Sequence, residues 1–138
     1  SLGIKTARKG DLLGISLYRR VYSTTFSFLH KIIPLFPEGF YITYPFPPNF
    51  YFIKAKLISW LLKKETIVLE LQAEPWFSQG VSLEEQEKTM DLKKFEEVIQ
   101  FAKKSGFSTF YLWGGEWWYW LKETQKENSF WERARYLF

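Results

Sequence analysis

Three short segments in which apolar side chains alternate with small or polar ones constrain the fold of this chain most. They are residues 11–19, 67–76 and 107–113. Because successive side chains of a strand point to opposite faces, each segment is predicted to be a strand with one apolar face. Those faces are formed by Leu13, Ile15 and Leu17, by Ile67, Leu69, Leu71 and Ala73, and by Phe110 and Leu112. Pro75 cannot donate to a central sheet ladder, so the second strand should end next to Glu74.

Helical patterns separate these strands. Residues 50–64 carry apolar side chains at helical spacing, and Lys63 and Lys64 suit a last turn. A second helix should begin near Ser82, which forms a capping-box pattern with Glu85, and run to residue 104 with a break near Met90. Gly106 should stop it. A final amphipathic helix is predicted over 130–137.

Strands separated by helices predict right-handed β-α-β units and a parallel sheet. The second strand face is expected to carry Gly14, Ser16, Glu70, Gln72 and Thr109. An open, doubly wound sheet would have two apolar faces, so a polar second face favours the interior of a closed barrel. Three units are too few to close one. We therefore expect an α/β chain whose residues 1–138 are the C-terminal portion of a larger barrel domain. A beginning at Ser1 suggests such a fragment, or a chain whose leader has been removed.

Composition narrows the function classes. Seven Trp, eight Tyr and fourteen Phe are more rings than a core of this size needs, so some are expected to line a groove. The net charge of +4 is spread along the chain without a basic run, which disfavours nucleic acid as a partner. With no Cys, we expect neither a disulfide scaffold nor a thiolate metal site, and the single His30 disfavours a histidine-based zinc site and a serine triad. No metal site and no cofactor are expected. Localisation and oligomeric state stay undecided.

The connection over residues 21–49 is longer than an unstructured loop usually is, so it should be functional or partly helical. Its aromatic rings and prolines favour an ordered lid, and a subunit-contact loop is the alternative. The apolar stretch over 35–62 is interrupted by prolines and charges before it reaches the roughly twenty residues of a spanning helix. No membrane span is expected, although association through this stretch remains a third hypothesis.

In parallel barrels the active site forms at the C-terminal ends of the strands. Here those ends are Tyr18 to Arg20, Glu74 to Trp76, and Trp113 to Trp118. One cleft would then hold two carboxylates, a phenol, an arginine and at least three indoles. That composition suits a carbohydrate, whose C–H faces stack on indoles while its hydroxyls bond to carboxylates.

Three motifs resemble the last part of the retaining glycoside hydrolases of clan A, the cellulase-like (β/α)8 barrels. Residues 11–18 are similar to the sixth strand with its active-site Tyr. Residues 71–76 are similar to the seventh strand, whose terminal Glu is the nucleophile in that clan. Residues 110–116 are similar to the eighth strand, whose terminal Trp forms a sugar platform. The resemblance implies strands six to eight of a barrel, and hydrolysis of O-glycosidic bonds in an oligo- or polysaccharide.

Carried over by position, the resemblance makes Glu74 the nucleophile, Tyr18 its hydrogen-bond partner and Trp113 the platform. Trp76, Glu116 and Gln72 are further candidate sugar contacts. The family's acid/base lies on a fourth strand, which this chain does not contain. Retaining hydrolysis needs two carboxyl groups about 5 Å apart, so the chain alone is expected to be inactive unless Glu116 substitutes.

Several assignments stay open. Glu116 follows two glycines and could point inward or outward. Glu70 needs a partner if buried, and Arg19 or Arg20 could form an ion pair with it. Trp117, Trp118 and Trp120 could serve packing or binding. The alternative to an enzyme is a non-catalytic carbohydrate-binding or structural module, in which Glu74 only hydrogen-bonds sugars.

Overall fold

The chain forms a mixed α/β fold in a computed structural model that describes residues 9–25, 27–33, 35, 39–77 and 80–137. The first half contains β1 (Leu12–Leu17), β2 (Arg20–Ser23), α2 (Ser27–Ile32), β3 (Phe40–Thr43) and α3 (Pro48–Leu62). The second half contains β4 (Glu65–Gln72), α4 (Leu83–Glu87), α5 (Leu92–Ser105), β5 (Phe110–Trp113), α6 (Gly115–Trp120), the π-helix η1 (Leu121–Gln125) and α7 (Ser129–Arg135).

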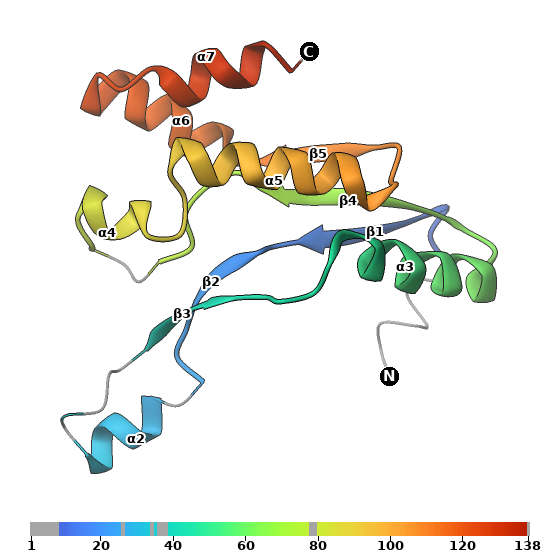
Figure 1. The fold of residues 1–138 in the computed structure, drawn as a ribbon, viewed down its shortest axis with the longest axis horizontal. Coiled ribbons are helices and arrows are strands. Elements are labelled where there is room, and N and C mark those ends of the chain that lie inside the picture. Colours follow the sequence, from blue (N-terminus) through green and yellow to red (C-terminus); the bar gives the residue numbers. More distant parts are fainter. Residues whose placement is uncertain (1–8, 26, 34, 36–38, 78–79, 138) are drawn as a thin grey trace.

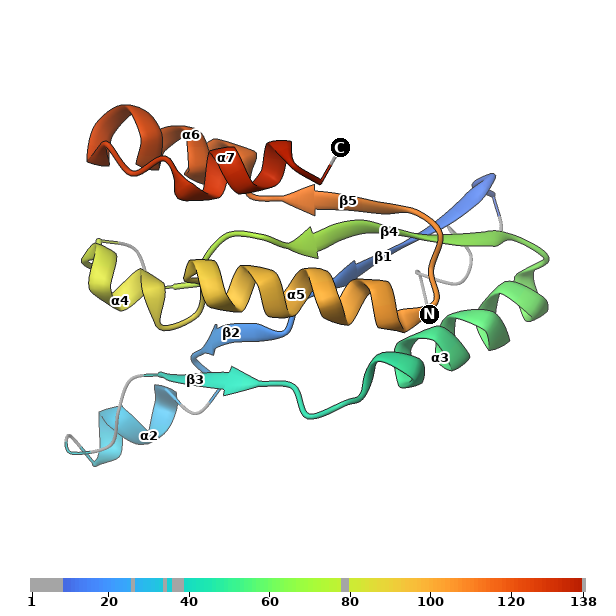
Figure 2. The ribbon, with the colours of Figure 1, turned by 45° about the horizontal axis from the view of Figure 1, so that its top comes forward.

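The predicted parallel sheet is present. Its strand order is β1-β4-β5, and both neighbouring pairs are parallel. In Figures 1 and 2, α3 and α5 lie on the same face of this sheet, and no described helix covers the other face. The α/β class is therefore confirmed, whereas the three strands form an open sheet and no closed barrel.

The core lies between the sheet and α5. Leu17, Val68 and Leu71 are almost fully buried on the sheet side, and Phe95 and Val98 on the helix side. Burial of such side chains is the main contribution to the stability of a domain of this size. The sheet and α5 thus provide the rigid base on which the strand ends stand.

The residues at which α4 and α5 begin and end are those with capping interactions or a capping conformation. Ser82 accepts a hydrogen bond from the Glu85 amide at 3.3 Å, and Asp91 caps α5 by accepting one from the Lys94 amide at 2.7 Å. The predicted break near Met90 is therefore confirmed. Gly106 ends α5 with a φ of 82°, a conformation that glycine adopts without strain. The helix predicted over 50–64 begins at Pro48, and Lys63 caps its end.

One strand prediction is wrong, because β4 contains a bulge. Val68 pairs with Ile15 and Glu70 with Ser16, which leaves Leu69 without a partner in β1. The extra residue shifts the alternation, so Val68 is buried while Leu69 is 50% exposed and lies against Gly14. Leu71 and Ala73 do face the core, as predicted.

The segment over 21–49 is partly helical, as predicted, and it also forms a hairpin that the sequence did not indicate. β2 and β3 pair antiparallel beyond the end of β1, with α2 at the far end of the hairpin (Figure 1). Tyr41 donates to the Glu85 carboxylate at 2.6 Å, and Arg20 forms an ion pair with Glu97. These contacts attach the hairpin to α4 and α5. Phe36, one of the aromatic residues in this predicted lid, lies outside the described residues.

Three helical elements follow β5, where a single helix over 130–137 was predicted. α7 corresponds to that helix, whereas α6 and η1 were not foreseen. Arg133 pairs with Glu96 and so connects α7 to α5. None of the helices in the described part of the chain has the length and apolar character needed to cross a membrane.

Candidate functional site

The C-terminal ends of the three parallel strands bring most of the predicted site residues together. Tyr18 follows β1, Glu74 follows β4, and Trp113 is the last residue of β5. The Ala73 amide donates to the Trp113 carbonyl at 2.9 Å, which joins the ends of β4 and β5. A hollow of about 190 Å³ opens there, lined by Glu74, Trp113 and Glu116 among others.

The backbone beneath Glu74 is fixed from several sides. Gly114 has a φ of 152°, and a Cβ at this position would lie 2.5 Å from the Ala73 carbonyl oxygen. The Trp118 indole donates to the same oxygen at 2.7 Å. On the other side of Glu74, the Trp76 amide donates to Thr89 Oγ1 at 3.0 Å. The backbone that carries Glu74 is therefore held by packed elements on both sides.

Opposing influences act on the Glu74 carboxyl. Its pKa is raised above the ordinary value, chiefly by burial, while a hydrogen bond from Trp113 lowers it and the charge of Glu116 raises it further. Both neighbours thus act on this one group. Glu116 lies exposed at the start of α6, and its charge reaches Glu74 across their shared hollow.

The phenol of Tyr18 responds to the charge of Glu74, but its hydrogen bond goes to Glu70 and not to Glu74, the partner that the resemblance implied. Burial, then the charges of Glu70 and Glu74, and then that hydrogen bond raise the pKa of Tyr18 to about 12. The phenol is therefore protonated at neutral pH. Its ring meets Trp76 edge to face, with centroids 5.1 Å apart and planes at 79°.

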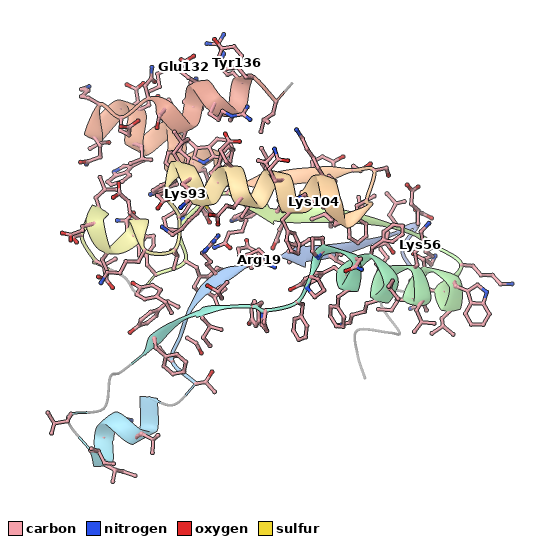
Figure 3. All side chains as sticks on the ribbon, viewed as in Figure 1. Arg19, Lys56, Lys93, Lys104, Glu132 and Tyr136 are labelled. Atoms are coloured by element: carbon pink, nitrogen blue, oxygen red, sulfur yellow. The ribbon has the colours of Figure 1, made fainter. Side chains whose placement is uncertain are left out.

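The expected ion pair between Glu70 and Arg19 or Arg20 is wrong. Glu70 instead accepts a hydrogen bond from Ser16 Oγ at 2.8 Å. Both arginines turn toward α5, Arg20 pairing with Glu97. Arg19 donates to a backbone carbonyl at 2.8 Å, and its guanidinium lies 4.1 Å from the Phe101 ring centre (Figure 3). Both guanidinium groups, which were predicted to lie near Glu70 on the polar face of the sheet, therefore make their contacts on the side of the sheet that α5 covers.

Gln72 is fully buried and bonds to backbone groups. Its Oε1 accepts from the amides of Arg19 and Arg20, each at 2.9 Å, and its Nε2 donates to the Arg20 carbonyl at 2.5 Å. It therefore holds the base of the hairpin in place. Direct contact between Gln72 and a sugar stays a prediction.

The tryptophans divide by exposure. Trp76 and Trp113 are 47% and 48% exposed, so each has ring surface available to a ligand. Trp117 and Trp118 are buried, and their indoles donate to Gln86 and to the Ala73 carbonyl. These two are packing residues, one of the options left open by the sequence. Trp120 is partly exposed on α6.

A second, larger hollow was not predicted. It has a volume of about 450 Å³ and is lined by Ser16, Tyr18, Glu70 and Trp76 together with Val21, Tyr22, Ser23 and Tyr44 of the hairpin region. Sequence reasoning missed the second group because it did not foresee the hairpin. The signal available was the aromatic content of residues 21–49.

Within the described ranges, no three acidic or histidine side chains are grouped so that they could hold a metal ion. No family model matches this chain, and neither does any curated protein or solved structure.

Proposed function

We propose that this chain supplies the nucleophile side of a retaining glycoside hydrolase, with Glu74 as the nucleophile. One observation carries the proposal: a half-buried carboxylate, on a backbone fixed by Gly114 and Trp118, stands at the C-terminal end of a parallel strand and shares a hollow with the half-exposed indole of Trp113. In the proposal, this carboxylate meets the anomeric carbon of a sugar stacked on Trp113. This arrangement suits a carbohydrate better than a phosphate or a nucleic acid.

In the proposed reaction, a Glu74 oxygen attacks the anomeric carbon and the bond to the leaving oxygen breaks, which gives a covalent glycosyl ester. Water then cleaves this ester and restores the carboxylate. Ionised Glu74 is the reactive form. The Trp113 hydrogen bond favours that form, whereas burial and Glu116 oppose it.

A second carboxyl group, about 5 Å from the nucleophile, must protonate the leaving oxygen. Glu116 is the candidate in this chain, because it shares the hollow with Glu74. The other source is a carboxylate on a further barrel strand. The polar, uncovered sheet face that bears Ser16 and Glu70 supports the proposal that these units belong to a closed barrel, in which this face would lie near the functional end, where the active site forms.

The nucleophile can be tested in this chain without a general acid. 2,4-Dinitrophenyl 2-deoxy-2-fluoro-β-glycosides of glucose, mannose and xylose lose dinitrophenolate as a stable anion, and the fluorine slows hydrolysis of the ester. We expect mass spectrometry of digested protein to find the fluoroglycosyl group on Glu74. Glu74→Gln should give no adduct, and Glu116→Gln should keep it. An adduct elsewhere, or none with any of the three sugars, would refute the assignment.

A non-catalytic carbohydrate-binding site is the second candidate. The exposed rings of Trp76 and Trp113 favour it, because stacking needs no acid. In that case Glu74→Gln weakens sugar binding without abolishing it, and no adduct forms.

A further inference from the structure

The larger hollow lies between the sheet and the hairpin. Ser16, Tyr18 and Glu70 form its sheet side, while Tyr22 and Tyr44 belong to the hairpin side and Trp76 completes the wall. Residues from four separate chain segments therefore surround one concave space of about 450 Å³, which is within the range of small-molecule sites.

The chemistry of the lining favours a neutral sugar. Trp76 and Tyr44 are 47% and 39% exposed and offer ring surface, while Glu70 and two serines offer hydrogen-bonding oxygens. None of the described residues that line this hollow is a lysine or an arginine. A phosphate or an acidic ligand would meet the Glu70 carboxylate without a compensating cation, whereas pyranose hydroxyls can donate to it.

Two residues that line the larger hollow are linked to Glu74. Tyr18 and Trp76, whose rings are in contact, line the larger hollow, and Trp76 follows Glu74 by two residues. Tyr18 also responds to the charges of both Glu70 and Glu74, so it lies near both carboxylates. One sugar chain could therefore contact both hollows.

The hairpin wall is held in place before any ligand binds. The Tyr44 amide donates to the Arg19 carbonyl at 2.9 Å, Gln72 bonds to the backbone at the hairpin base, and Tyr41 bonds to Glu85. A preformed wall reduces the entropy lost on binding.

From these observations we infer that the hollow over Glu70 is a second sugar subsite, which binds the unit adjacent to the one held at Glu74. The inference rests on the proposed function, since it takes the Glu74 hollow as the first subsite. It makes the ligand an oligosaccharide of at least two neutral units, with Trp76 and Tyr44 as the stacking residues of the second unit.

The test is calorimetric titration of the 138-residue chain with β-1,4-linked oligomers of glucose, mannose and xylose, each with one to three units. For at least one sugar we expect affinity to rise about tenfold from one unit to two, equivalent to about 1.4 kcal/mol.

Trp76→Ala and Tyr44→Ala should remove this rise, while Trp113→Ala should weaken binding at every length. Trp60→Ala, which changes a 75% exposed tryptophan on α3, is the matched control and should change nothing. Circular dichroism establishes that each variant is folded, and Tyr44→Phe should keep the stacking contribution.

The outcomes separate the two proposals. If a length-dependent rise survives both Trp76→Ala and Tyr44→Ala, or no oligomer binds, the second subsite is refuted, even if the fluoroglycosyl adduct forms on Glu74. If the rise depends on Trp76 and Tyr44 but no adduct forms, the subsite stands and the hydrolytic proposal fails.

Discussion

Replacing Gln72 with methionine should destabilise the fold and loosen the hairpin. The two side chains are similar in length, so the change removes hydrogen bonds with little loss of volume. Two backbone amides and one carbonyl, at 2.9, 2.9 and 2.5 Å from the Gln72 amide, lose their side-chain partner. Each polar group left unpaired in a partly buried position costs about 1–3 kcal/mol. Because water can reach part of the hairpin base, we expect a total loss of about 2–4 kcal/mol.

That loss converts into a measurable shift in Tm. An unfolding entropy of about 2.1 cal/mol/K per residue means that 1 kcal/mol lowers the Tm of a chain of this length by roughly 3–4 °C. Gln72→Met should therefore melt about 7–14 °C below the wild type. Urea unfolding followed by far-UV circular dichroism measures the free energy independently.

The control for this change is Gln100→Met, which places the same side chain on the exposed surface of α5 and should leave stability within about 0.5 kcal/mol. Hydrogen exchange of the Arg19 and Arg20 amides provides a local readout, and it should quicken only in Gln72→Met. If Gln72→Met is as stable as the Gln100 variant and these amides remain protected, Gln72 does not hold the hairpin.

Two further predictions concern the end of β4. Gly114→Ala should cost about 2 kcal/mol or more, because its Cβ would meet the Ala73 carbonyl oxygen at 2.5 Å; Gly115→Ala, which has open space, should cost far less in the same melting experiment. Glu74→Gln should raise the Tm at pH 7, because burial raises the pKa of the Glu74 carboxyl in the folded state. Such a group stabilises the fold at pH values below its ordinary pKa of 4.5, and this contribution is lost as the pH rises through the raised pKa. The difference should disappear below pH 4, and a lower Tm for the variant at pH 7 would contradict the role of burial.

The order and type of the main elements were predictable from local sequence. Alternation located the three parallel strands, and Ser82 and Gly106 located helix ends, because each signal depends on residues a few positions apart. The approach of Tyr18, Glu74 and Trp113 at one edge also followed from the sequence, since the C-terminal ends of parallel strands meet there.

Tertiary structure decided what depends on partners distant in the chain. The bulge at Leu69 exists only in relation to the pairing of β4 with β1 and β5, and it changes which side chains face the core. Gln72 forms hydrogen bonds with backbone groups some fifty positions away at the hairpin base. Arg20 forms an ion pair with Glu97 on α5 rather than with Glu70. A local pattern specifies which face a side chain takes within a regular strand. It does not specify which distant polar group satisfies that side chain, because this depends on how the separate elements pack.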